Sequence, residues 1–200
     1  MKSSPLENIS LPEPKLTGGM SLMEALKNRH TQRDFSSDKY MSLQQVSECL
    51  WCAYGNNRES EHGKKTVASA VNMCSLTLFV FMKNGVYKYN PEKKLLEFLI
   101  KGDLREKTGK QDFVKNANLN IVFMQDLNIN SPYKEFNLNI EEKKRCCDID
   151  AGHCTQNIYL YAASQGLKCV ERGMADEKIL KEVLGLGDNF RLVITISVGH

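Results

Sequence analysis

The 200-residue sequence contains no long apolar run and no large excess of charge of one sign. No uninterrupted stretch approaches the roughly 18 apolar residues that a membrane-spanning helix needs. The 27 lysines and arginines nearly balance the 24 aspartates and glutamates, which leaves a net charge of +3 at pH 7. Because nucleic-acid-binding domains usually carry a strongly basic face, the sequence predicts neither a membrane nor a nucleic acid as partner.

Glycine-based signatures of common nucleotide-binding and hydrolytic enzymes are also missing. The sequence has no Gly-x-Gly-x-x-Gly, no phosphate-binding loop ending in Gly-Lys-Ser or Gly-Lys-Thr, and no Gly-x-Ser-x-Gly. Those loops cradle phosphates or expose a nucleophilic serine. Functions that depend on them are therefore not predicted.

The seven cysteines form no even disulfide framework of the kind found in small secreted domains. Most lie in apolar runs such as ECLWCAYG (48–55), where a reduced cysteine behaves as a small hydrophobic side chain. The first 20 residues contain three prolines and no apolar signal core. These features predict a reducing compartment and a cytoplasmic location, while the removal of an earlier leader stays open.

The segment CCDIDAGHC (146–154) combines cysteine with histidine but lacks the spacing of a zinc site. Zinc ligands usually come as Cys-x-x-Cys pairs, whereas Cys146 and Cys147 are adjacent and would point about 100° apart on a helix. We therefore predict no metal site and expect buried thiols in a helical core. A nucleophilic cysteine with a histidine from elsewhere in the chain stays open.

Residues 1–19 are predicted to form an extended N-terminal arm, because three prolines disfavour helix and Gly18-Gly19 ends the segment. Residues 20–200 are expected to form a single domain. Capping boxes predict helices after Ser21 and after Ser42, the first with an apolar face from Leu22, Met23, Ala25 and Leu26. Gly55 follows the second helix, and residues 55–66 are predicted to be a loop.

Apolar runs predict the strands. Two such runs flank Asn84-Gly85, the pair typical of a type I′ hairpin turn, and further runs cover 118–125 and 190–199. Residues 95–100 form either a strand or an apolar turn, and 168–173 a strand or a bend. Helices are expected from about Ile140 to Gln165 and over 176–186. The fold class is therefore α+β, or a mixed α/β sheet, with helices covering its faces.

The seven residues RHTQRDF (29–35) concentrate positive charge and hydrogen-bonding groups just after the first helix. Arginine offers a planar fork of donors that stays charged, which suits a phosphate or the pyrimidine edge of a flavin. Arg29 and Arg33 share a face if the helix continues and line one wall if it ends. The alternative is a solvated basic helix end that complements the helix dipole.

Polar residues also interrupt the apolar stretch KKTVASAVNMCS (64–75) just before a buried strand. Thr66, Ser69 and Asn72 could turn backbone amides and a side-chain amide toward a ligand. In the alternative, Ser69 caps a short helix and Asn72 ends a turn. The residues alone leave both interpretations open.

Taken in order, four segments resemble motifs of the nitroreductase family of flavin enzymes. RHTQRDF resembles the N-terminal Arg-(Arg/His)-(Ser/Thr)-x-(Arg/Lys)-x-Phe motif, and ASAVNMCS (68–75) is similar to Pro-Ser-(Ser/Ala)-x-Asn-x-Gln-Pro. DAGHCTQNIYLYAASQGL (150–167) resembles the helix that carries the dimer contact. VERGMADEKILKEVLGL (170–186) is similar to the stretch whose glycine meets the flavin ring. The hairpin GVYKYNPEKKLLEFL (85–99) resembles the branch that contains SagB-type dehydrogenases.

The resemblance implies a nitroreductase-like fold of the α+β class with a mostly antiparallel central sheet, in an intertwined homodimer that binds FMN at its interface. Arg29, His30 and Thr31 would face the phosphate and ribityl chain, and Arg33 the N1 and O2 edge of the flavin. The neighbouring chain would add Ser69, Ala70 and Asn72. Gly173, preceded by Arg172, would offer a backbone amide near flavin N5. The flavin carries the redox chemistry, so no catalytic side chain is predicted.

The sequence departs from the family pattern at three places. Ala68 replaces a proline and Cys74-Ser75 replaces Gln-Pro. Arg172 stands where many members have an acidic residue, which bears on nicotinamide preference and substrate charge. Many members also have a basic phosphate ligand after the last strand, and Lys64 or Lys65 could replace it here.

The implied activity is hydride transfer from NAD(P)H through FMN to a nitroaromatic, a quinone or a related small acceptor, in ping-pong order. One alternative is a SagB-like dehydrogenase that oxidises azolines in a peptide. Another is a flavin-binding or thiol-rich protein without enzymatic activity.

Overall fold

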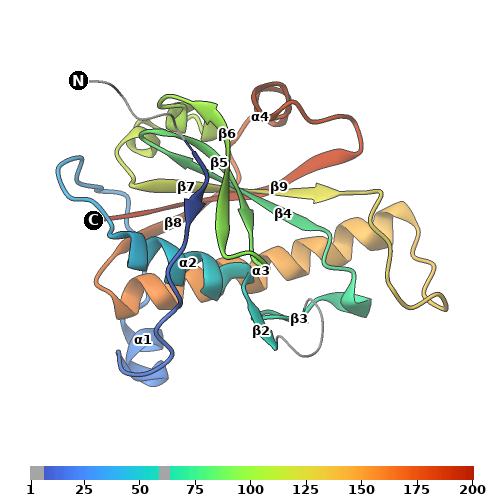
Figure 1. Ribbon diagram of the computed structural model, residues 1–200, viewed down its shortest axis with the longest axis horizontal. Coiled ribbons are helices and arrows are strands. Elements are labelled where there is room, and N and C mark those ends of the chain that lie inside the picture. Colours follow the sequence, from blue (N-terminus) through green and yellow to red (C-terminus); the bar gives the residue numbers. More distant parts are fainter. Residues whose placement is uncertain (1–6, 59–63) are drawn as a thin grey trace.

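The computed structural model describes residues 7–58 and 64–200 (Figure 1). The strands are β1 (Ile9–Ser10), β2 (Asn56–Arg58), β3 (Lys64–Lys65), β4 (Leu76–Met82), β5 (Gly85–Asn90), β6 (Leu95–Lys101), β7 (Leu119–Asp126), β8 (Lys168–Arg172) and β9 (Phe190–Gly199). The α-helices are α1 (Leu22–Asn28), α2 (Leu43–Tyr54), α3 (Ile140–Ser164) and α4 (Glu177–Leu184). Short 3-10 turns are η2 (Ala70–Asn72), η3 (Arg105–Thr108) and η4 (Asp112–Lys115).

Seven strands form one sheet in the order β1-β6-β5-β4-β7-β9-β8, and every neighbouring pair is antiparallel. This confirms the predicted α+β class. The segment predicted as a loop after α2 instead begins and ends in a small antiparallel pair, β2 with β3. Residues 59–63 of that predicted loop lie outside the described part of the chain.

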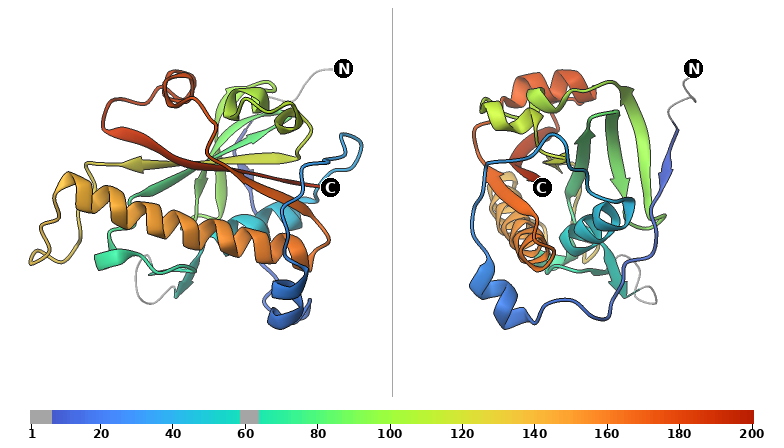
Figure 2. Two further views of the ribbon diagram at one scale, coloured as in Figure 1. Left: turned by 180° about the vertical axis from the view of Figure 1, so that it is seen from behind. Right: turned by 90° about the vertical axis from the view of Figure 1, so that its left-hand side faces the viewer.

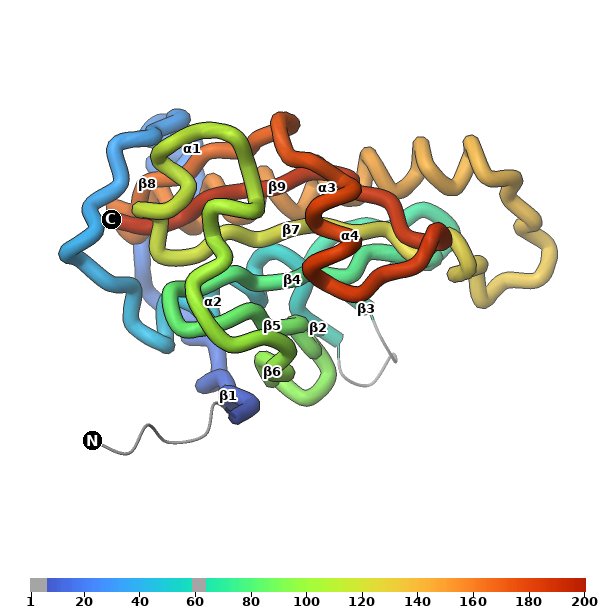
Figure 3. Tube along the Cα trace, turned by 90° about the horizontal axis from the view of Figure 1, so that it is seen from above, coloured from blue at the N-terminus to red at the C-terminus, as the bar shows by residue number. Residues whose placement is uncertain are grey.

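Helices cover both faces of the sheet. Helices α2 and α3 pack on one face, and α4 with the η3–η4 segment lies on the other (Figures 2 and 3). The central strands β4 and β7 each contain a continuous apolar run, at residues 78–82 and 121–124, because alternate side chains enter the two cores. Leu78, Val80, Ile121 and Phe123 join the α2–α3 core, whereas Phe79, Phe81, Val122 and Met124 join the α4 core.

The N-terminal arm is attached along most of its described length. Ile9 pairs with Leu96 at the sheet edge, and the Ser47 hydroxyl donates to the Pro12 carbonyl at 2.5 Å. The arm therefore extends the sheet by one short strand and then crosses α2. The boundary at residues 19 and 20 stays a prediction.

The hairpin predicted at Asn84-Gly85 is present, but its turn type is not the predicted one. Met82 pairs with Gly85, so the two-residue loop is Lys83-Asn84. None of these residues has a positive φ, which a type I′ turn would require. Gly85 is needed for space instead, because a Cβ there would lie 2.8 Å from the carbonyl oxygen of Ile100 on β6.

Both predicted capping boxes are formed, at Ser21 with Glu24 and at Ser42 with Gln45. Helix α2 ends one residue later than its predicted C′ glycine implies. Gly55 is the C-cap, with an extended backbone at φ −73° and ψ 164°. A left-handed conformation therefore does not explain this glycine.

The apolar face predicted for α1 is not covered by its own chain. Ala25 is 5% exposed, but Leu22, Met23 and Leu26 are 64%, 74% and 45% exposed. An exposed apolar helix face of this kind marks an interaction surface. Only one of the four predicted residues therefore contributes to the core.

Gly55→Ala should lower the free energy of unfolding by about 1–3 kcal/mol, the usual effect of overpacking. A Cβ at this position would lie 2.3 Å from Cδ1 and 2.7 Å from the carbonyl oxygen of Trp51. Urea denaturation followed by tryptophan fluorescence measures the change. Asn57→Ala, an exposed substitution two residues away, is the control, and equal stabilities of the two variants would refute this explanation of Gly55.

Candidate functional site

The predicted site residues fall into two groups that contact α3 at different points. The first group is the segment 29–33, which lies beside Tyr159. The Thr31 hydroxyl is 3.2 Å from the Tyr159 hydroxyl, and the Arg29 guanidinium lies 5.4 Å from the centre of the tyrosine ring. Tyr159 also accepts a hydrogen bond from the backbone N–H of Glu171 at 2.8 Å. Tyr159 therefore joins the segment to α3 and β8.

The segment 29–33 is extended rather than helical, which decides between the two predicted geometries. Helix α1 ends at Asn28, and Arg29 has φ −61° and ψ 118°. The Gln32 N–H donates to the Cys169 carbonyl at 3.0 Å, which ties the segment to β8 (Figure 2). Alternate side chains of an extended chain point the same way. Arg29, Thr31 and Arg33 therefore line one side.

Positive charge gathers along this segment with little compensation. Arg33 is exposed, and the described residues offer its guanidinium no hydrogen-bond or ion-pair partner. Lys168 pairs with Asp34 at 2.7 Å, and this hydrogen bond holds the pKa of the Asp34 carboxyl below its usual value. A cavity of about 510 Å³ adjoins the segment, lined in part by Lys27, His30 and Tyr159. Arg29 and Arg33 do not line this cavity, but their guanidinium forks on the adjoining segment suit an anionic group.

The second group, Ser69 to Asn72, is fixed by one buried carboxylate on α3. Asp150 accepts hydrogen bonds from the Ser69 hydroxyl at 2.5 Å and from the Ala70 N–H at 3.4 Å. The Ser69 hydroxyl in turn accepts from the Cys74 N–H at 3.0 Å. Ser69 makes no side-chain capping bond to η2. Its predicted alternative role as a helix cap is therefore wrong.

The backbone after Ser69 is strained. Val71, Asn72 and Cys74 have φ values of 49°, 50° and 46°. Left-handed conformations are costly for residues other than glycine, above all for a β-branched valine. Such strain persists only where the surroundings fix it, and it concentrates at functional sites.

The two groups contact α3 at separate points. Their anchors are Asp150 and Tyr159, nine positions apart on one helix. At 1.5 Å per residue this separation is about 14 Å along the helix axis. The predicted site residues of segments 29–33 and 69–72 therefore lie beside different turns of α3.

Gly173 is exposed immediately after β8, whereas the Arg172 side chain turns into the protein. Arg172 is 3% exposed, and its guanidinium donates to the Thr108 carbonyl at 2.7 Å and to the Asn120 side-chain oxygen at 3.3 Å. Burial lowers its pKa to about 10. At this position, where many family members have an acidic residue, the side chain therefore does not reach the surface of the chain.

Lys65, the predicted substitute for a phosphate ligand, is also buried, at 8% exposed. Its ammonium donates to the Asn56 side-chain oxygen at 2.7 Å and lies 5.3 Å from the centre of the Tyr54 ring. Lys65 and Asn72 line one cavity, which does not include residues 29–33.

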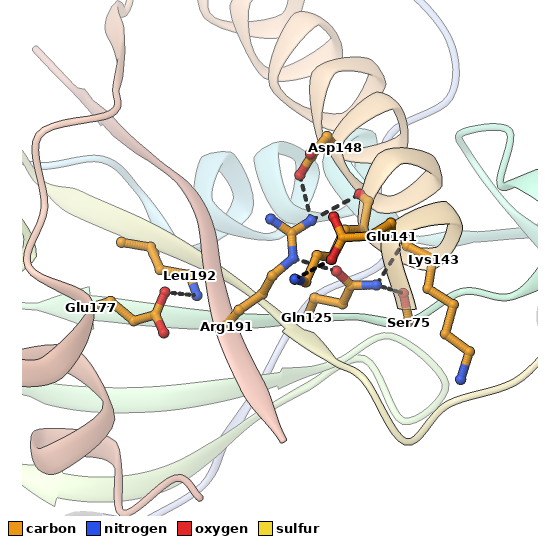
Figure 4. A network of polar contacts seen from close by, with 9 residues as sticks. Ser75, Gln125, Glu141, Lys143, Asp148, Glu177, Arg191 and Leu192 are labelled. Atoms are coloured by element: carbon orange, nitrogen blue, oxygen red, sulfur yellow. Dashed lines mark hydrogen bonds and ion pairs between the residues drawn. The ribbon is translucent and has the colours of Figure 1, made fainter. Parts of the chain in front are cut away.

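Sequence reasoning missed the polar network that holds α3 to the sheet (Figure 4). Arg191 on β9 donates to the Gln125 side-chain oxygen at 2.6 Å and to the Lys144 carbonyl at 2.9 Å, and it pairs with Asp148. Gln125 donates to the Lys143 carbonyl at 3.0 Å. An arginine inside a predicted apolar strand was the signal available in the sequence.

Two cysteines of segment 146–154 lie in the core, as the sequence analysis predicted when it favoured buried thiols over a metal site. Cys147 and Cys154 are fully buried, and all seven cysteines are free. Among the described residues, no three histidine, cysteine, aspartate or glutamate side chains are placed to hold a metal ion. In the same part of the chain, no helix combines the length and apolar character needed to cross a membrane.

Comparison with known proteins assigns the family. The family model described as "Nitroreductase family" matches residues 26–200. The chain belongs to the nitroreductase family. This is a family of oxidoreductases, and the predicted nitroreductase-like fold is confirmed.

Individual members of the nitroreductase family support the assignment. A crystal structure of a protein from Ralstonia eutropha, named a nitroreductase, is 33% identical with a TM-score of 0.87, and the match covers 99% of this chain and 91% of that one. MJ1384 of Methanocaldococcus jannaschii, also named a nitroreductase, is 29% identical over 89% of this chain and 91% of its own. A protein of Staphylococcus epidermidis named an NAD(P)H:FMN oxidoreductase shares the fold, with a TM-score of 0.65 and 15% identity over 94% of this chain and 90% of that one.

Asp150 should make the stability of the protein depend on pH. Burial raises its pKa above the ordinary 3.8, so the folded state holds this proton more tightly than the unfolded state. The stabilisation is complete below pH 3.8 and is lost as pH rises through the folded-state pKa. The stability advantage of the wild type over Asp150→Asn should therefore shrink as pH rises from about 4.5 to 7.5.

Urea denaturation of the ligand-free protein at several pH values checks this expectation. Glu135→Gln, which removes an exposed carboxylate, shows the effect of a generic charge change. An advantage over Asp150→Asn that stays constant or grows with pH would contradict the assignment.

Proposed function

We propose that the protein is an FMN-dependent oxidoreductase that takes hydride from NAD(P)H and reduces nitroaromatic, quinone or related small acceptors in ping-pong order. The observation that carries the proposal is the exposed segment 29–33 with the unpartnered guanidinium of Arg33. A second, strained group lies at Ser69 to Asn72. The α3 residues that contact the two groups are about 14 Å apart along the helix axis. Neither group forms a complete site alone.

A homodimer would complete the site. Helix α3 leaves Ile149, Gly152 and Gln156 exposed at a spacing that places them on one face, and Ile149 is 52% exposed. If two copies packed antiparallel about a two-fold axis halfway between the anchors, Asp150 of one chain would face Tyr159 of the other. The Ser69–Asn72 group of each chain would then meet segment 29–33 of its partner. The exposed apolar face of α1 gives further surface for such contact.

The donor set fits a flavin mononucleotide. Arg29, His30 and Thr31 supply charged and neutral donors for a phosphate and a polyol chain. Ser69, Ala70 and Asn72 of the second copy would bring a hydroxyl and amides to the opposite side. Gly173 is exposed and has no side chain to prevent close approach of a ring.

When bound, FMN would supply the hydride transfer. The task of the chain is to bind it, to orient it and to stabilise negative charge where it develops. Arg33 would place a fixed positive charge at the N1 and O2 edge, where such charge counts most. No general acid, base or nucleophile of the chain is needed.

Two other functions predict different behaviour of the purified protein. A non-enzymatic flavin-binding protein would be yellow but would not lose its colour with NADH or NADPH. A peptide azoline dehydrogenase would use the same flavin site with a peptide as hydride donor. We expect yellow protein that NADH or NADPH bleaches and that a quinone or nitroaromatic reoxidises. Colourless protein that ignores added FMN would overturn the proposal.

Arg33→Ala should weaken FMN binding by about 10–100-fold, the loss expected for one or two charge-assisted hydrogen bonds. It should also lower the midpoint potential of the bound flavin, because a positive charge favours the reduced form. Fluorescence titration and a spectroelectrochemical titration measure the two effects. Arg58→Ala removes the same charge from the exposed strand β2 and is the control. Unchanged affinity and potential in Arg33→Ala would remove Arg33 from the site.

Ile149→Glu should produce a monomer, because a charge on the exposed face of α3 would be buried without a partner in the dimer. FMN affinity should fall at least 10-fold together with the loss of the dimer. Analytical ultracentrifugation and FMN titration measure both. Lys178→Glu, on α4 across the sheet, should change neither. A wild type that is monomeric yet binds FMN fully would contradict the shared site.

A further inference from the structure

The sheet divides where β4 and β5 separate. Their pairing ends at Phe79 with Lys88. Beyond this point, the described residues Leu76–Leu78 pair only with β7, and Tyr89–Asn90 pair only with β6. In an antiparallel strand, successive residues turn their N–H and C=O groups to alternate sides. The backbone N–H and C=O groups of at least one residue of Leu76–Leu78 therefore point away from β7 into the opening, where no neighbouring strand pairs with them.

A cavity of about 370 Å³ lies at this division. Its apolar wall includes Leu76, Leu78 and Tyr89, and its polar lining includes Tyr54 and Lys65 together with the charged residues Lys88 and Glu92. A cavity that combines an apolar wall with fixed polar groups is suited to a small molecule. The cavity lies apart from segment 29–33 and from the second cavity beside that segment.

Two buried donors in this lining lack the partners they need. The Tyr54 side chain is 4% exposed, and its hydroxyl has no hydrogen-bond partner. The Lys65 ammonium can donate three hydrogen bonds, yet it makes one, to Asn56. No carboxylate of the described residues forms an ion pair with it. Burial lowers the pKa of Lys65, which expresses the cost of desolvating its charge. The Glu92 carboxylate in the same lining opposes this shift but forms no ion pair with Lys65.

We propose that this cavity binds a small organic carboxylate. The carboxylate accepts hydrogen bonds from the Lys65 ammonium and the Tyr54 hydroxyl, and the apolar body of the ligand lies against Leu76, Leu78 and Tyr89. A compact aromatic or branched acid matches both the volume and the two kinds of wall. An uncharged molecule of the same shape would leave the ammonium without its anion.

The cavity also lies directly behind one of the two groups proposed to bind the flavin. Asn72 and Cys74 line it, and both belong to the strained backbone that Asp150 anchors. A ligand in the cavity would therefore contact the segment proposed to reach the FMN of the second copy. This coupling depends on the proposed function, whereas the binding of the carboxylate does not.

Isothermal titration calorimetry of benzoate into the flavin-free protein tests the proposal. We expect saturable binding that benzyl alcohol, an uncharged analogue, reproduces at least 10-fold more weakly. Lys65→Met should weaken benzoate binding at least 10-fold, and Tyr54→Phe several-fold. Lys64→Met, which changes the neighbouring and more exposed lysine, should bind as the wild type does. If Lys65→Met does not fold, Tyr54→Phe and the benzyl alcohol comparison decide the question in folded protein.

Absence of benzoate binding up to about 20 mM, or equal binding by the wild type and Tyr54→Phe, would overturn the inference. A second measurement separates it from the earlier prediction that Lys65 holds the FMN phosphate. If Lys65→Met lowers affinity for FMN but not for riboflavin, and FMN displaces benzoate from the wild type, Lys65 is a phosphate ligand and the inference fails. Protein that binds benzoate but no flavin would refute the proposed function alone.

Discussion

The contact between Asp150 and the Ser69–Ala70 segment is the interaction on which the rest of the site depends. One buried carboxylate accepts a hydroxyl and a backbone N–H from a segment 81 positions away in the sequence. It thereby holds a backbone in which Val71, Asn72 and Cys74 all adopt left-handed conformations. Each such residue costs about 1–2 kcal/mol, so without this anchor the segment would relax. Asn72 and Cys74 of the same strained segment line the cavity proposed to bind a carboxylate, and in the proposed homodimer Asn72 would reach the flavin of the second copy.

Helix α3 sets the distance between this contact at Asp150 and the contact of segment 29–33 with Tyr159. It carries Asp150 in its middle and Tyr159 nearer its C-terminal end. Because α-helices curve only gently, the distance between these two residues is nearly constant. Arg191, Gln125 and Asp148 fix its first half to β7 and β9 (Figure 4). Tyr159 and the cavity around segment 29–33 lie at its other half. The helix therefore fixes the distance between these two contact points. In the proposed homodimer, a second copy of the chain would bring the complementary group and would have the exposed apolar side chains of α1 available for contact.

Local signals allowed much of the fold to be predicted, and contacts distant in sequence account for what was missed. The capping boxes at Ser21 and Ser42 act within four residues, so sequence alone reveals them. The hairpin was predicted correctly from Asn84-Gly85, but its turn type was wrong. Gly85 is needed for the close approach of Ile100 on another strand, a contact that the local sequence does not reveal. The charge and polar residues of the segments at Arg29 and Ser69 made both of them candidates, and the family resemblance supplied their expected roles. Their anchors Tyr159 and Asp150 lie in an ordinary helical pattern, which gives no indication of the partners they contact.

Arg172 illustrates how the interior of the sheet can contribute charge to a site without contacting it. Its guanidinium is buried and held by Thr108 and Asn120, and its Nε has no hydrogen-bond partner. No carboxylate of the described residues forms an ion pair with it. Gly109 permits this arrangement, because a Cβ there would lie 2.0 Å from the guanidinium.

An isolated buried cation opposes folding, and proteins retain such features chiefly near functional sites. A positive charge fixed in a poorly polarisable interior acts over longer distances than one in water. Arg172 directly precedes Gly173 in the chain. In the proposed function, its buried positive charge would favour a negatively charged group near Gly173 and its side chain would leave the surface free for the ligand.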